Sequence, residues 1–290
     1  MSRVDTRSKA ALHRDAYPVG RVAAEFFLRS FEIIGQLHRN VMSSLILLTL
    51  WHEALAEPTA ARPMSVRELS RRLDLPFETV RRHIRRLARN GSCLSGRNGI
   101  TLAPTVQRSA RASAMLRKIH RHAVRMLDDL GRIDVARYRP RRPPTVQSRQ
   151  LEGEQAVVVV AAIGVLLAAM KVLRRFSDGD LVSGLVFTAI RTANVKHITD
   201  DARAANRGII PDTDRLPVSM LAIADSICVP YETVRRHAKA LVGQGKCVRV
   251  GRRGLIAPAR VFRRMDVESA AVHALVLDFL AELKAAGVRV

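Results

Sequence analysis

The chain contains few aromatic side chains and few cysteines. Phe, Trp and Tyr together make up 4% of its 290 residues. Surfaces that stack RNA or single-stranded DNA bases depend on exposed aromatic rings, so this composition argues against them. The three cysteines form no Cys-x-x-Cys pair, which favours packing roles in a reducing compartment over disulfides.

Sequence signals for catalysis are also missing. The nine histidines show no metalloprotease spacing, and the glycines form no phosphate-binding loop motif. His120 and His122 lie among arginines, where we expect a solvated helix face. We therefore predict no enzyme activity, no catalytic residue, no metal site and no cofactor.

Acidic residues are scarce in relation to basic ones. The chain has 49 Lys and Arg against 26 Asp and Glu, a net charge of +23. A protein this basic attracts polyanions, so nucleic acid is the first candidate partner and an anionic membrane is the competitor. Residues 1–17 are charged and lack the apolar core of a signal peptide. We expect a flexible basic N-terminus on a cytoplasmic, nucleoid-associated bacterial protein.

The most informative feature that is present is an internal repeat. Residues 78–83 and 232–237 both read Glu-Thr-Val-Arg-Arg-His, 154 positions apart. Aligned without a gap, 63–104 and 217–258 share 14 identical residues in 42 positions. Such a period is far longer than that of a solenoid unit, and the chain length fits two domains. We therefore expect two halves, each built around one copy.

Each copy predicts two helices followed by a hairpin. In the first copy, Ser65 and Glu68 form a capping-box pattern that opens a short helix. After a tight turn, Pro76 suits the first position of a second helix, which Gly91 ends. This helix has one apolar stripe at helical spacing and arginines over the rest of its surface. Residues 93–102 then predict two short strands around an Asn-Gly turn.

Helix, tight turn, helix and hairpin together resemble the winged helix-turn-helix of bacterial regulators of the MarR, GntR and Lrp type. The resemblance covers 63–104 and 217–258. It implies that the second helices, 76–90 and 230–242, enter successive major grooves of DNA while the hairpin wings touch the backbone. The sequence departs from the family pattern at Pro76 and its counterpart Pro230, where many relatives have a small polar capping residue.

The resemblance and the chemistry of the side chains together predict a set of DNA contacts. Arginine pairs bidentately with guanine and basic side chains bind phosphate. The predicted base contacts are Phe77, Glu78, Arg81, Arg82, Tyr231, Glu232, Arg235 and Arg236. The predicted backbone contacts are Ser65, Thr79, Arg85, Arg86, Arg97, Ser219, Thr233, Lys239, Arg252 and Arg253.

One pair of residues within this set has two possible roles. Glu78 and Glu232 either accept a hydrogen bond from a cytosine amino group or pair with an arginine of their own helix. His83 and His237 are expected to bridge the core and a phosphate.

The rest of the chain predicts helices that flank the two copies. The first half spans 18–131, with one long helix after the first copy, and the second half spans 148–290. Between them, 132–147 is rich in Pro and Arg, which predicts a stiff basic linker. Residues 156–170 are uncharged and mostly aliphatic, but shorter than the roughly 20 residues of a bilayer span. We therefore expect a helix that is buried on all sides and joins the halves.

These observations predict a mainly α fold with small β-wings, in which two winged helix-turn-helix domains form a pseudodimer within one chain. The expected function is sequence-specific transcription regulation on double-stranded DNA, with RNA polymerase as a candidate partner and no membrane. Two alternatives stay open, a plasmid-type replication initiator and a nucleoid-architectural DNA-binding protein. A membrane-associated protein is a more distant alternative that rests only on 156–170.

Overall fold

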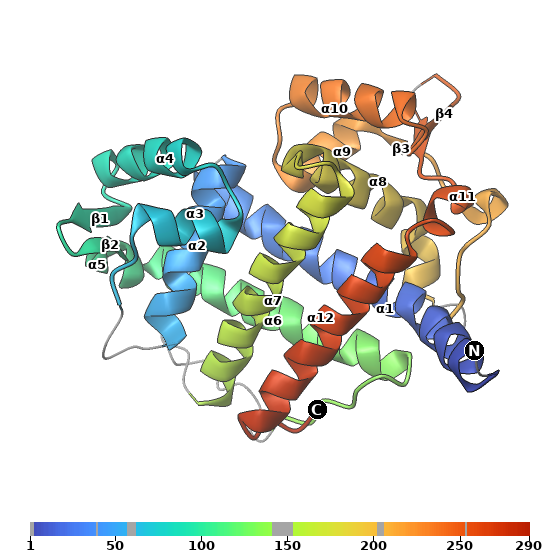
Figure 1. Ribbon diagram of the computed structural model, residues 1–290, viewed down its shortest axis with the longest axis horizontal. Helices are drawn as coiled ribbons and strands as arrows, with labels where there is room; N and C mark the ends of the chain where they lie inside the picture. Colours follow the sequence, from blue (N-terminus) through green and yellow to red (C-terminus); the bar gives the residue numbers. More distant parts are fainter. Residues whose placement is uncertain (1–2, 39, 57–61, 141–152, 202–205, 253) are drawn as a thin grey trace.

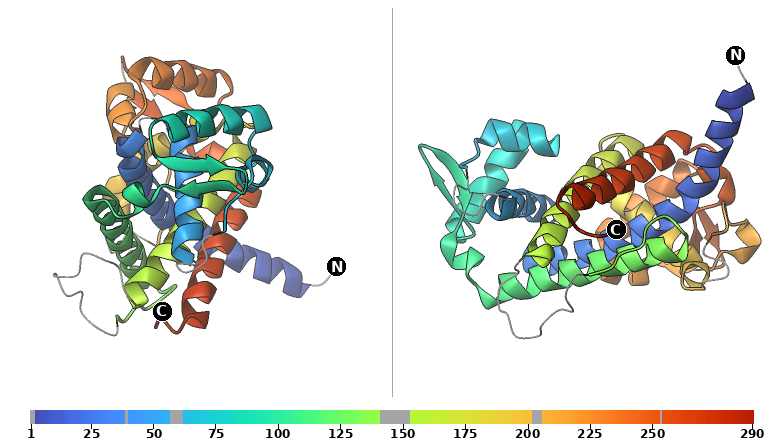
Figure 2. Two further views of the ribbon diagram at one scale, coloured as in Figure 1. Left: turned by 90° about the vertical axis from the view of Figure 1, so that its left-hand side faces the viewer. Right: turned by 90° about the horizontal axis from the view of Figure 1, so that it is seen from below.

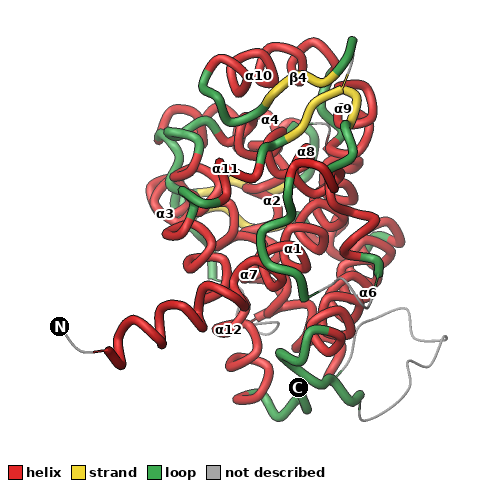
Figure 3. The backbone as a smooth tube through the Cα atoms, turned by 90° about the vertical axis from the view of Figure 1, so that its right-hand side faces the viewer, coloured by secondary structure: helices red, strands yellow, loops and turns green. Residues whose placement is uncertain are grey.

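The computed structural model describes residues 3–38, 40–56, 62–140, 153–201, 206–252 and 254–290. Helices account for 70% of the described residues, and the strands form two small antiparallel sheets. This composition confirms the expectation of a mainly α fold with small β elements. Figure 3 shows the strands confined to short hairpins at the edges of the helical body.

The same order of elements occurs twice along the chain (Figure 1). The elements of the first half are α1 Arg3–His38, α2 Val41–Ala56, α3 Val66–Leu73, α4 Phe77–Arg89, β1 Cys93–Gly96, β2 Gly99–Leu102, α5 Pro104–Gln107 and α6 Ala110–Arg132. Those of the second half are α7 Glu154–Phe176, α8 Leu181–Thr199, the 3-10 turn η1 Asp212–Asp214, β3 Val218–Ser219, α9 Met220–Ile227, α10 Tyr231–Gly243, β4 Val248–Val250, β5 Gly254–Ile256, α11 Ala259–Phe262 and α12 Asp266–Ala285.

Four long helices form the centre of the molecule. α1 packs against α6 and α12, and α7 packs against the same two helices. α7 also contacts α2 of the first half, and α1 contacts α8 of the second. Each half therefore contributes one helix to the core of the other. Most of the buried hydrophobic side chains form one cluster that spans both halves, and Val195, Ile198 and Ile210 form a small separate one.

The helix over 156–170 joins the halves as expected, but it is not buried on all sides. Val158, Ile163 and Leu166 are buried, whereas Val157, Val165 and Leu167 are only partly covered. α7 is also the one described helix long and apolar enough to cross a membrane by length and composition. Its contacts with α2, α6, α8 and α12 give it a protein environment instead.

The N-terminal segment differs from the expectation of a flexible 1–17. α1 begins at Arg3 and continues through Pro18 to His38, and its first turns extend beyond the body of the molecule (Figure 2). Arg, Lys, Ala and Leu, which are frequent in this segment, have high helix propensity, and that preference favours a helix over these residues. Tyr17 then anchors the helix, since its hydroxyl donates to the carbonyl oxygen of Phe262 at 2.6 Å.

One boundary was predicted wrongly. The helix expected after the first copy is two helices, because the hydroxyl of Ser109 caps α6 by accepting from the N–H of Ala112 at 3.1 Å. At the start of α8 the cap residue is Asp180. Asp180 accepts from two backbone N–H groups of the first turn, whereas Asp178 has a left-handed backbone with φ 52°.

The described part of the predicted linker ends at residue 140, and 141–147 lie outside the described residues. Arg139 donates its backbone N–H to the carbonyl oxygen of Arg289 at 2.9 Å. The Tyr138 hydroxyl donates to Glu154 at 2.9 Å. The start of this segment is therefore fixed against the C-terminus and against α7.

Candidate nucleic-acid interface

The first helix-turn-helix is set by local chemistry. The Ser65 hydroxyl caps α3 by accepting from the N–H of Glu68 at 3.0 Å. Asp74 ends α3 in the left-handed conformation, φ 52° and ψ 45°, which reverses the chain within one residue. Pro76 is the N-cap residue of α4, whereas the sequence predicted it at the first helical position, one residue later in the helix. Its fixed backbone angle stiffens the entry to the helix.

The second helix-turn-helix is built in the same way from different residues. The Ser219 hydroxyl caps α9 by accepting from the N–H of Ala222 at 3.1 Å. Cys228 is left-handed, φ 52° and ψ 39°, and corresponds to Asp74 of the first half. Pro230 is the cap residue of α10. The same backbone path is therefore taken twice, although cysteine rarely adopts this conformation.

Each helix pair is followed by a hairpin. β1 pairs with β2 from Cys93↔Leu102 to Gly96↔Gly99, and β4 pairs with β5 from Val248↔Ile256 to Val250↔Gly254. A short segment before the first helix adds to each hairpin, as an isolated bridge in the first half and as strand β3 in the second. At the first hairpin the positive backbone angle, φ 127°, falls on Gly99 rather than on the preceding asparagine.

Two buried cysteines support these hairpins. Cys93 and Cys247 precede the first strand of each hairpin or begin it, and both are buried. Burial raises the pKa of the Cys93 thiol to about 11 and that of Cys247 to about 12. The thiols are therefore neutral at pH 7 and act as small packing groups.

A histidine fastens each second helix to the core. The Nδ1 atom of buried His83 lies 3.0 Å from the Ser43 hydroxyl on α2, and Nδ1 of His237 lies 2.9 Å from the Ser183 hydroxyl on α8. His237 also lies 2.9 Å from a carboxylate oxygen of Asp180. Both histidines therefore contact the core, as predicted. Their contact with a DNA phosphate stays a prediction.

The serine partners were missed from the sequence. Ser43 and Ser183 are 140 positions apart, the offset at which Ser44-Leu45-Ile46 aligns with Gly184-Leu185-Val186. This alignment was the one feature of the sequence that could have identified the two serines as equivalent. A single serine gives no indication of a hydrogen bond to a residue 40 positions away.

The first glutamate of each helix pairs with an arginine one turn later. Arg81 donates from Nε to Glu78 at 2.9 Å, and its Nη2 lies 2.7 Å from the same oxygen. Arg235 and Glu232 have the same geometry, with both distances 2.8 Å. Two roles were considered for these glutamates, a contact to cytosine and an ion pair with an arginine of the same helix. The structure contains the ion pair. At exposed positions such a pair adds little stability, but it fixes the direction of the guanidinium group.

The remaining predicted contacts are mostly at the surface. Thr79, Arg81, Ser219 and Thr233 are half-buried, and Arg253 lies outside the described residues. The exposed ones are Ser65, Phe77, Glu78, Arg82, Arg85, Arg86, Arg97, Tyr231, Glu232, Arg235, Arg236, Lys239 and Arg252. Among these, Phe77 and Tyr231 are 44% and 41% exposed.

The two basic helices share one side of the molecule. α4 and α10 lie along the upper side in Figure 1, and the left panel of Figure 2 again places both there. They run in opposite directions, with their N-terminal ends toward the middle and the hairpins toward the outer ends. α4 carries five arginines and one acid, and α10 carries two arginines, one lysine and one acid. The arrangement can present positive charge to a polyanion at two places on one surface.

The first half also contains a cavity of about 520 Å³ below α4. It lies among α2, α5 and α6, and Leu47, Leu48, Trp51, Val106 and Met115 contribute much of its lining. In the second half, the corresponding space next to Phe187 is about 40 Å³.

His120 and His122 do not lie on a solvated face as expected. One ring nitrogen of each is buried without a hydrogen-bond partner among the described residues. Burial, followed by nearby arginines, lowers the pKa of His122 to about 4. The helix packs closely enough against α1 that the arginine-rich neighbourhood is no guide to solvation.

The part of the chain that the structure describes contains no group of three or more His, Cys, Asp or Glu placed to hold a metal ion. Comparison with protein-family models, with curated proteins and with solved structures finds no match to this chain.

Proposed function

We propose that the protein is a sequence-specific double-stranded DNA-binding transcription regulator. In this proposal, 63–104 and 217–258 are winged helix-turn-helix units that arose by duplication, and the chain acts as a covalent pseudodimer. α4 and α10 serve as recognition helices and the two hairpins as wings. RNA polymerase is a candidate further partner.

The observation that carries the proposal is the paired presentation of α4 and α10. Each follows a tight turn, exposes arginines on its outer face, and is tied to the core through one histidine. Their opposite directions on one side of the molecule are what an approximate two-fold axis produces (Figure 1). A two-fold arrangement of this kind suits half-sites about 34 Å apart on one face of DNA.

The repetition of contacts supports the duplication. α1 packs on α6 as α7 packs on α12, and α2 packs on α4 as α8 packs on α10. The helix pairs α3–α4 and α9–α10 also correspond. Together with the sequence identity between the two copies, these matching contacts support a common origin of the halves.

Selection of binding sites from fragmented genomic DNA tests the proposal. The purified protein is incubated with the fragments, washed at about 150 mM salt to suppress purely electrostatic binding, and the retained DNA is sequenced. We expect discrete peaks near promoters that share an imperfect inverted repeat. Arg81→Ala should lose these peaks, whereas Arg289→Ala should retain them, because Arg289 is exposed near the C-terminus, away from α4 and α10.

The same measurement separates the alternatives. Enrichment at repeated sites beside one AT-rich origin would favour a replication initiator. Broad recovery without a motif, lost as salt rises, would contradict the regulator and favour an architectural role.

A matched pair of variants distinguishes base recognition from phosphate binding in α4. Arg86→Ala removes an exposed arginine from the C-terminal part of the helix, so it should weaken all sequences alike and reduce the slope of log K against log salt by about 1. Arg81→Ala should instead relax the preference at one base position. Identical behaviour of the two variants would contradict the assignment of α4 as a recognition helix.

A further inference from the structure

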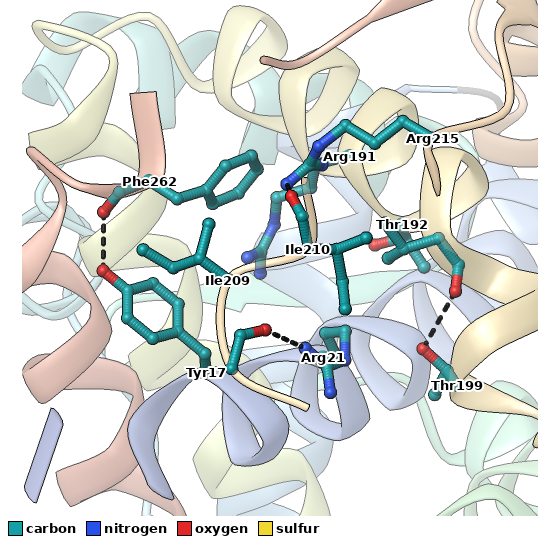
Figure 4. Close-up of a pocket in the computed structure, with 11 residues that line it drawn as sticks. Tyr17, Arg21, Arg191, Thr192, Thr199, Ile209, Ile210, Arg215 and Phe262 are labelled. Atoms are coloured by element: carbon teal, nitrogen blue, oxygen red, sulfur yellow. Dashed lines mark hydrogen bonds between the residues drawn. The ribbon is translucent and has the colours of Figure 1, made fainter. Parts of the chain in front are cut away.

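Three arginine side chains from separate segments meet in the second half (Figure 4). Arg21 comes from α1, Arg191 from α8, and Arg215 from the segment between η1 and β3. They line a pocket of about 30 Å³ together with Thr192 and Phe262. Arg215 is only 7% exposed, so this is an interior cluster of like charge rather than a solvated face.

Backbone oxygens and an aromatic ring hold these groups in place. Arg191 donates to the carbonyl oxygen of Gly20 at 3.3 Å. Arg215 donates to the carbonyl oxygen of Ile210 at 2.9 Å, and its guanidinium carbon lies 4.5 Å from the centre of the Phe262 ring. Carbonyl groups and rings orient a guanidinium group, but they do not neutralise it.

Arg21 is held in the same manner on the other side of the pocket. It donates to the carbonyl oxygens of Arg207 at 2.7 Å and of Gly208 at 3.0 Å. These two bonds connect α1, which belongs to the first half, to the segment that precedes η1 in the second.

The negative charge near Arg191 and Arg215 is small. In the part of the chain that the structure describes, the carboxylate oxygen found within ion-pair distance of these two groups is Oδ1 of Asp212, 3.5 Å from Nε of Arg215. That oxygen also accepts the N–H of Ala259 at 2.6 Å, so it is shared. Burying charge without a counter-charge is costly.

The electrostatics of the cluster are consistent with excess positive charge. Burial, and then Arg215, lower the pKa of Arg191 to about 10. Burial also lowers the pKa of Arg215, while Asp212 opposes that change. Both side chains remain charged at pH 7. The pocket wall also contains the Thr192 hydroxyl, which is buried without a hydrogen-bond partner among the described residues.

We propose that this pocket binds an oxyanion group, a phosphate or a carboxylate, through Arg191, Arg215 and Thr192. Guanidinium forks match the oxygens of these groups, and a hydroxyl completes the set of donors. The pocket is small, about 30 Å³. It therefore takes a single charged group, either a free ion or the end of a larger molecule. The occupant ties α8 to the segment between η1 and β3.

This proposal is independent of DNA binding. Its test uses isothermal titration calorimetry on the whole protein without DNA, at constant ionic strength. Inorganic phosphate, acetate, a nucleoside monophosphate and chloride are titrated separately. We expect saturable binding of one oxyanion per chain, with chloride much weaker. Tighter binding of the nucleoside monophosphate than of phosphate assigns the site to a phosphate ester, and tighter binding of acetate assigns it to a carboxylate.

Three variants localise the binding. Arg191→Gln should weaken it by roughly tenfold or more, because a charge-assisted contact is lost. Thr192→Val keeps the shape of the side chain and both arginines, so it should weaken binding less and leave the melting temperature in chloride nearly unchanged. Arg289→Gln removes one exposed positive charge elsewhere and should bind as the original protein does.

Equal loss in Arg191→Gln and Arg289→Gln would overturn the proposal, since the heat would then come from screening of the net charge. Binding that does not saturate, or equal binding of chloride and phosphate, would overturn it as well. Weakened but measurable binding in a folded Thr192→Val protein, together with a larger loss in Arg191→Gln, supports the proposal even if Arg191→Gln is partly destabilised.

Discussion

The two halves have the same plan of helices and hairpins but fill their interiors differently. When the two halves are aligned at an offset of 140 positions, Leu47 of α2 corresponds to Phe187 of α8. Phe187 is 1% exposed, and its ring lies 4.7 Å from that of Phe176 and 6.2 Å from that of Phe262. In the first half, Leu47 lines the cavity of about 520 Å³.

The outer surfaces of the two halves also differ, although part of α4 is identical to part of α10. The Glu-Thr-Val-Arg-Arg-His core and its internal ion pair are the same in α4 and α10, whereas Arg85, Arg86 and Arg89 of α4 correspond to Lys239, Ala240 and Gly243. The parts retained in both halves are the turn, the histidine anchor and the first helical turn. Interior filling and outlying charge vary, which is expected if one helix geometry must be kept while each half meets different surroundings.

The largest expected effect comes from removing a buried aromatic ring from the interior of the second half. Phe187→Ala should reduce the free energy of unfolding by about 3–5 kcal/mol, because a buried ring is lost from a cluster of three. Leu47→Ala should cost less, since its neighbours already border open space. Urea denaturation followed by circular dichroism measures both, and an equal loss at the two positions would show that the cavity does not distinguish the halves.

The proposed half-sites can be separated next. Arg81→Ala should cost about 1–3 kcal/mol at one base position. Arg235→Ala should cost a similar amount at a different position, because the two helices occupy different grooves in the proposed complex. Fluorescence anisotropy with a panel of singly substituted operators locates each loss. Loss at the same positions for both variants would contradict the pseudodimer on DNA.

Filling the cavity of the first half should change the free energy of unfolding by a smaller amount and in the opposite direction. Leu47→Phe introduces the residue of the second half into the cavity and should raise the stability by about 0.5–2 kcal/mol. The melting temperature measured by differential scanning calorimetry reports the change. A lowered melting temperature would mean that the added ring is strained, as in an overpacked core.

The smallest effect concerns acid stability of the first half. The folded protein lowers the pKa of His122 from 6.5 to about 4, so the unfolded chain takes up the proton first as pH falls. Stability should therefore be unaffected above pH 7 and decrease between about pH 6.5 and 4. His122→Asn should flatten this decrease, whereas exposed His197→Asn should not. Stability curves measured against pH for the three proteins provide the check.

Much of the local structure followed from the sequence. Ser65 caps its helix as the pattern indicated, and the first hairpin begins at Cys93, where the first strand was predicted. The apolar periodicity of 76–90 also identified its buried face, with Val80, Ile84 and Leu87 in the core. These features depend on neighbours within a few residues, which is the range over which capping, turns and periodicity act.

Tertiary structure alone decided the rest. Arg21, Arg191 and Arg215 are 170 and 24 positions apart in sequence, and no spacing rule brings them into one pocket. The bond between His83 and Ser43, the cavity beside Leu47 and the burial of His122 depend likewise on how separate helices of the first half pack. Local preferences determine where helices begin and which face is apolar, whereas the burial of charge and the filling of space are properties of the assembled core.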